Sequence, residues 1–123
     1  MITLWNHRQR VVIEIWQIEK QTLRIHIINR THQTIELKEY GLHLSNGDDL
    51  SREAAWPGTR TSFRAMKPGS DFPSDWSIPG LKQEIKQKHD GATVEFAYAT
   101  DAAIEKYRYK AKVPRRVKRL LED

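Results

Sequence analysis

The residues best suited to chemistry are histidines and carboxylates, and their spacing limits what they can do. The histidines are His7, His26, His32, His43 and His89. They show neither the helical spacing of four nor the clustering typical of zinc ligands. His26 and His43 would meet if their strands were neighbours, with His32 near the same end. The alternative, which we favour, is that they are ordinary strand and loop residues, and the sequence predicts no metal site.

Five acidic residues fall within residues 46–78, namely Asp48, Asp49, Glu53, Asp71 and Asp75. Paired carboxylates can bind calcium or exchange protons. The Asp48-Asp49 pair lacks the alternate spacing of a calcium-binding loop, and the neighbouring Asn46-Gly47 indicates a turn. The chain has no cysteine, no G-x-S-x-G motif and no glycine-rich phosphate loop. We therefore expect a non-enzymatic protein with no cofactor and no catalytic residue.

Aromatic side chains gather in the same stretch. Trp56, Phe72 and Trp76 lie there together with Met66. Because large aromatics dominate recognition surfaces, these three aromatics are the candidate residues for binding a protein partner. Trp76 is the best candidate for an exposed position. The interpretation that we favour is that they fold down and close an end of the core, which needs their large area.

Positive charge is concentrated at the C-terminus. Residues 105–123 hold eight Lys or Arg against three Asp or Glu, which accounts for the whole net charge of +5. The cations are Lys106, Arg108, Lys110, Lys112, Arg115, Arg116, Lys118 and Arg119. They suggest binding to nucleic acid or an anionic surface. Tyr107 and Tyr109 point to the opposite strand face, which argues against an aromatic platform, so a solvated strand and terminus is the alternative.

Period-two hydrophobic patterns predict a mainly β, antiparallel sandwich of about seven strands. The strands are expected at 11–19, 23–28, 34–39, 42–45, 61–66, 92–100 and 104–113, with a bend at Tyr40-Gly41. One short helix is expected near 79–89. Val94, Phe96 and Tyr98 are expected on one face. Residues 1–113 would form the domain, 46–78 its long loop region, and 114–123 a basic tail that is either a helical turn or disordered.

Three stretches carry a resemblance to a known type of domain. They are residues 25–31 followed by 34–37, residues 40–47, and residues 94–109. Their order is similar to that of the immunoglobulin-like β-sandwich domains of uncharacterised bacterial proteins. The chain lacks the Cys…Trp…Cys signature of antibody domains. The resemblance implies a fold and no activity, because such sandwiches serve many functions.

The 123-residue length fits one domain, and no apolar run approaches the roughly 20 residues of a membrane span. We expect a soluble and cytoplasmic protein. The leading functional hypothesis is a protein–protein interaction module with an unidentified protein partner. Binding to nucleic acid or an anionic surface is the alternative, and an enzyme that uses loop carboxylates or histidines is a third. A homodimer stays open, because unprotected sandwich edges invite pairing.

Overall fold

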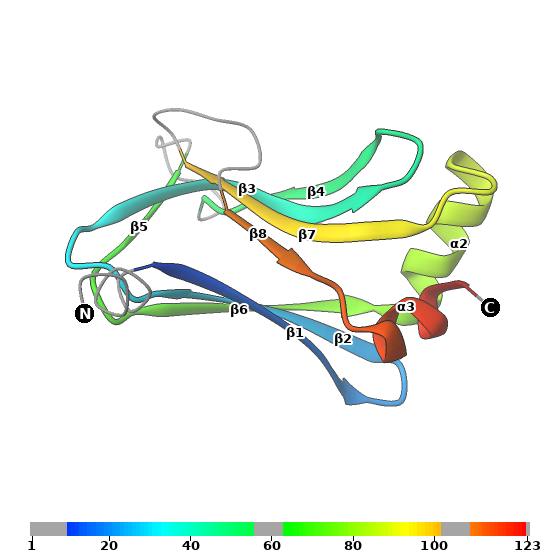
Figure 1. Cartoon of the computed structure of the whole chain (residues 1–123), viewed down its shortest axis with the longest axis horizontal. Helices are drawn as coiled ribbons and strands as arrows, with labels where there is room; N and C mark the ends of the chain where they lie inside the picture. The colour runs from blue at the N-terminus through cyan, green and yellow to red at the C-terminus, as the bar shows by residue number, and fades with distance from the viewer. Residues whose placement is uncertain (1–9, 56–62, 102–108, 123) are drawn as a thin grey trace, which may run out of the picture.

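The computed structural model describes residues 10–55, 63–101 and 109–122. These residues form two antiparallel sheets packed face to face, with two short helices at one end (Figure 1). The predicted mainly β sandwich is confirmed.

The first sheet has the order β1-β2-β6. Its strands are β1 (Val11–Glu19), β2 (Thr22–Asn29) and β6 (Asp71–Ser77). A two-residue turn joins β1 to β2, since Glu19 lies opposite Thr22. Leu23, Ile25 and Ile27 are completely buried, so the intervening residues of β2 face outward.

The second sheet has the order β4-β3-β7-β8, and β5 pairs with the first part of β3. Its strands are β3 (Ile35–Leu44), β4 (Asp49–Glu53), β5 (Arg64–Met66), β7 (Val94–Asp101) and β8 (Tyr109–Lys112). β3 continues through Gly41, where the sequence predicts a bend. A Cβ atom at Gly41 would overlap the Leu50 carbonyl oxygen, so the glycine allows β4 to approach closely.

The region 46–78, expected to be a long loop with one strand at 61–66, contains three strands, β4, β5 and β6, and β5 lies within the expected strand. A loop was expected where β6 lies, because the sequence DFPSDWS contains a proline and no β-branched residue. That expectation was wrong. Pro73 is tolerated because β6 is an edge strand, where a missing N–H faces away from the sheet.

The prediction that Val94 and Phe96 share a face was also wrong. The pairing of β3 with β7 shifts between these two residues. Val94 is buried in the core, whereas Phe96 stacks on His43, which lies between the inward-facing Leu42 and Leu44 and therefore points outward.

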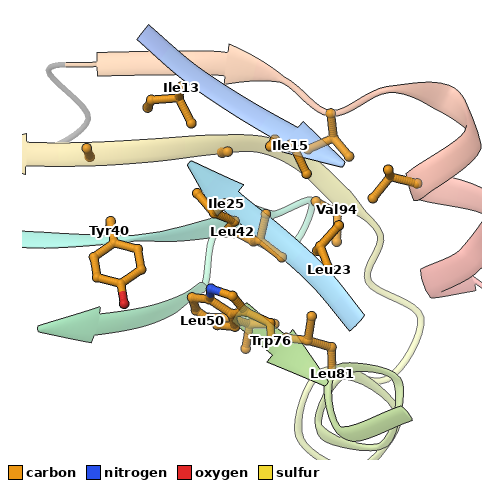
Figure 2. Packing of buried hydrophobic residues seen from close by; sticks show 14 of the residues in the cluster. Ile13, Ile15, Leu23, Ile25, Tyr40, Leu42, Leu50, Trp76, Leu81 and Val94 are labelled. Atoms are coloured by element: carbon orange, nitrogen blue, oxygen red, sulfur yellow. The ribbon is translucent and has the colours of Figure 1, made fainter. Parts of the chain in front are cut away.

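The core lies between the two sheets and extends under the helices. Figure 2 shows Leu23 and Ile25 of the first sheet facing Leu42 and Val94 of the second. Trp76 lies beside Leu50, between the sheets. Burial of this apolar surface is the main force that holds the layers together.

Both helices pack on the same end of the sandwich. The predicted helix is confirmed as α2 (Ile78–Lys88), which begins where the Ser77 side chain accepts a hydrogen bond from Gly80 N. The C-terminal residues form a second helix, α3 (Arg115–Glu122), which buries Val117 and Leu121. Of the two alternatives for this segment, helix is therefore correct, and α3 is part of the core.

Candidate functional site

A continuous set of exposed cations follows β8 and α3. On β8, Lys110 and Lys112 are exposed, while Tyr109 and Ala111 on the opposite face pack against the core. This alternation agrees with the sequence analysis. Lys106, Arg108 and Tyr107 lie outside the described residues.

The helix α3 continues this set of charges. Val117 and Leu121 face the core, which turns Arg115, Arg116 and Arg119 toward solvent. We call the described cations of β8 and α3 the basic surface; they are Lys110, Lys112, Arg115, Arg116, Lys118 and Arg119.

The charges of the basic surface are largely uncompensated. Lys110 lies over the Phe96 ring, with Nζ 4.9 Å from the ring centroid. The other members form no ion pair with any residue in the described part of the chain. By contrast, Arg24 binds Asp75 on the outer face of the first sheet with an N–O distance of 2.7 Å. That hydrogen bond lowers the pKa of Asp75 and raises the pKa of Arg24.

The beginning of α3 adds to the excess of positive charge. Lys118 N donates to the Pro114 carbonyl oxygen, so Arg115 and Arg116 are the first two residues inside the helix. This first turn has no acidic residue. Cations at the N-terminus of a helix are unfavourable because the helix dipole is positive there. A bound anion would therefore reduce the repulsion between these arginines and the helix dipole.

The candidate aromatic surface does not form as expected. Trp76 is 5% exposed and packs edge-to-face against Tyr40, with centroids 6.1 Å apart. Phe72 is half-buried against the same tyrosine, and Arg64 lies 4.2 Å above its centroid. The candidate exposed position of Trp76 was wrong, and the alternative of burial against the core is correct for this residue, because β6 turns it inward. Trp56 lies outside the described residues.

The histidines do not meet. His26 is on β2 and His43 on β3, in different sheets, and both lie between inward-facing residues, so they point outward from opposite faces. His26 Nε2 is 2.6 Å from an Asp71 oxygen, and His43 Nδ1 is 2.7 Å from an Asp49 oxygen. His32 is exposed in the β2–β3 turn, and His7 lies outside the described residues.

The loop carboxylates serve local structure. Asp48 accepts from its neighbour Asn46 and lies 2.9 Å from His89 Nδ1. Asp71 pairs with His26, Asp75 pairs with Arg24, and Glu53 is exposed at the end of β4. Within residues 10–55, 63–101 and 109–122, no group of three His, Asp or Glu is arranged to hold a metal ion.

The sequence analysis overlooked Phe96. Its ring stacks on His43, with centroids 4.6 Å apart and planes 23° apart, and Lys110 lies above it. The missing signal was the shift in strand pairing, which depends on β3 and cannot be seen in β7 alone.

No family model, curated protein or solved structure matches this chain. In the described part of the chain, neither helix is long and apolar enough to cross a membrane.

Proposed function

We propose that this protein binds nucleic acid through the phosphate groups, using the basic surface. The observation that carries the proposal is the uncompensated charge of this surface. Its cations are gathered on two consecutive elements, and Glu122 is the single acid among the described residues of those elements. Lys112, Arg115, Arg116, Lys118 and Arg119 form no ion pair with the described residues. Such cations can neutralise phosphates and release the counterions bound to them.

The placement on two different elements supports a polyanion as the partner. Lys110 and Lys112 project from a strand about 6–7 Å apart, and alternate residues of a strand keep that interval. Arg115 and Arg119 lie one turn apart on a helix, about 6 Å along its axis. Such a row of cations suits a repeating phosphate backbone better than it suits a single small anion.

A salt series on the intact chain tests the proposal. We expect binding of short DNA and RNA to weaken steeply between about 50 and 200 mM salt. The variant Arg115→Glu/Arg116→Glu/Arg119→Glu is expected to bind weakly and to show a slope of log affinity against log salt that is smaller by about 2–3. These side chains are exposed, so the fold is retained, whereas truncation at Val113 would remove part of the core.

A matched control is Arg30→Glu/Lys38→Glu/Lys67→Glu, which changes the net charge equally. These exposed residues lie in or beside the β2–β3 turn and β5, at the end of the sandwich away from the helices (Figure 1). The control is expected to keep most of the affinity. Equal loss in both variants would show that net charge alone acts, and absence of binding at low salt would refute the proposal.

Protein binding is a second candidate, favoured by two exposed side chains. Trp16 is 40% exposed and Ile18 is 37% exposed, both on β1 of the first sheet. Neighbouring exposed apolar residues can mark a protein contact. A second copy is the simplest partner, and sedimentation of the wild type against Trp16→Lys over a concentration series tests it.

We also infer that the sandwich is of the immunoglobulin-like type. The strand order supports this inference. Labelled in chain order, β1-β2-β6 corresponds to strands A, B and E, and β4-β3-β7-β8 corresponds to C′, C, F and G. The fold by itself assigns no activity.

A further inference from the structure

A groove lies between the two helices, next to the basic surface. Figure 1 shows α2 and α3 at the same end of the sandwich, and their residues are in contact. The groove has a volume of about 660 Å³, within the range of about 300–1,000 Å³ that ligand sites occupy. We call it the α2–α3 groove. The residues that carry the argument are Lys82, Ile85, Lys86, Asp90, Ala92 and Glu122.

The lining of the α2–α3 groove combines three kinds of group. Ile85 and Ala92 supply an apolar surface, and Ile85 is almost fully buried beneath it. Lys82 and Lys86 lie one turn apart on α2 and supply positive charge. Asp90 and Glu122 supply carboxylate acceptors. An apolar surface bordered by cations and hydrogen-bond acceptors is complementary to a nucleotide, which has an apolar base, polar base edges and a phosphate.

The groove is continuous with the basic surface. Lys118 precedes Glu122 by one turn on α3, so the cations of that helix lead to the rim of the groove. A strand whose phosphates lie along the basic surface would therefore pass the opening. A single strand can place a base inside without breaking a base pair, whereas a duplex would have to unpair and unstack it.

We propose that the α2–α3 groove binds an unpaired base of a single-stranded nucleic acid, and that it prefers bases with an exocyclic amino group. The inference rests on the proposed function. Asp90 and Glu122 accept hydrogen bonds from such amino groups, as carboxylates do from cytosine N4. Uracil and thymine present a carbonyl oxygen at that position, which the carboxylates would repel.

Fluorescence anisotropy with labelled oligocytidine, oligouridine and a duplex tests the inference on the full chain. We expect oligocytidine to bind roughly fivefold or more tightly than oligouridine, the lower end of what one specific base contact supplies. The variant Asp90→Asn/Glu122→Gln is expected to lose this preference. Its affinity for oligocytidine should fall to about that for oligouridine, because the two carboxylate acceptors are lost, while its affinity for oligouridine should rise slightly because two negative charges are removed.

The control is Glu36→Gln/Glu53→Gln, which removes the same charge from exposed positions on the sheet and should keep the preference. Salt-sensitive binding that is equal for oligocytidine, oligouridine and duplex would refute base binding in the α2–α3 groove, while leaving the proposed function intact. A preference that survives in Asp90→Asn/Glu122→Gln would overturn the assignment of these carboxylates. No binding to any probe would refute both proposals.

Discussion

Asn29 is fully buried at the end of β2 and uses every hydrogen-bonding group of its side chain. Its Nδ2 donates to the carbonyl oxygens of Gln33 and Met66, and its Oδ1 accepts from the backbone and hydroxyl of Thr31. We predict that Asn29→Asp lowers the free energy of unfolding by about 3 kcal/mol, because a buried carboxylate would face two carbonyl oxygens. Urea unfolding measures this. Gln33→Glu, exposed nearby, is the control and should change little.

Asp75 makes the free energy of unfolding depend on pH in the acidic range. The hydrogen bond from Arg24 holds the pKa of Asp75 below its ordinary value of 3.8. A lowered pKa in the folded state stabilises the fold above the ordinary pKa, and the contribution disappears as the pH falls through the folded value. We predict that Asp75→Asn is less stable than the wild type at neutral pH and that the difference shrinks below about pH 4. A difference that is independent of pH in urea titrations would contradict this.

The sequence predicts some residue positions well and others poorly for a physical reason. Lys110 and Lys112 alternate with residues that pack on the core, so their exposure follows from period two alone. Trp76 belongs to an equally regular strand, but the residue two positions before it is the polar Ser74. Ser74 is buried because its hydroxyl lies 2.7 Å from the Tyr40 hydroxyl. The buried Ser74 interrupts the period-two pattern of apolar residues in β6. Its burial could not be predicted, since its hydrogen-bond partner Tyr40 lies 34 residues away in the sequence.

At the scale of elements, α3 combines a stabilising apolar face with an electrostatically unfavourable beginning. Arg115 and Arg116 occupy its first turn, where acidic residues are preferred. We predict that Arg115→Glu raises the free energy of unfolding by about 0.3–1 kcal/mol and lowers the affinity for nucleic acid. Arg119→Glu in the last turn should lower the affinity as well, but should not stabilise. Thermal unfolding and anisotropy measured on the same samples distinguish these effects.

The elements themselves were predictable to different degrees. Long strands with β-branched residues, such as β1 and β2, and the capped helix α2 carry their own signals. β5 falls within the strand expected at 61–66, whereas β4 carries no such signal, because it is short and is held by pairing with β3. The α2–α3 groove was not predictable, since it depends on two helices and on the loop before β7.

At the scale of the whole molecule, the two flanks of the sandwich close differently. On one flank, Arg52 of β4 donates to the Asp75 carbonyl oxygen of β6 and lies 3.8 Å from the centroid of the Trp76 ring. On the same flank, Arg64 donates to the Ala54 carbonyl oxygen, and burial lowers the pKa of Arg64. On the other flank, β1 and β8 are in contact and lead into α3. Cations that join the sheets therefore lie on the flank away from the basic surface.

This distribution of charge predicts an unusual response of stability to salt. Neighbouring cations of the basic surface repel one another in the folded state, and the unfolded chain separates them. Raising the salt concentration from about 0.01 M to 0.1 M shortens the Debye length from about 30 Å to 10 Å, which screens this repulsion. We therefore predict that the midpoint of urea unfolding rises with salt in the wild type.

The variant Arg115→Gln/Arg116→Gln/Arg119→Gln should start from a higher midpoint of urea unfolding, and this midpoint should rise less with salt. Arg30→Gln/Lys38→Gln/Lys67→Gln, with the same net charge, should behave like the wild type. A wild-type midpoint that falls with salt would mean that attractive ion pairs, and not repulsion on the basic surface, dominate the electrostatics of the fold.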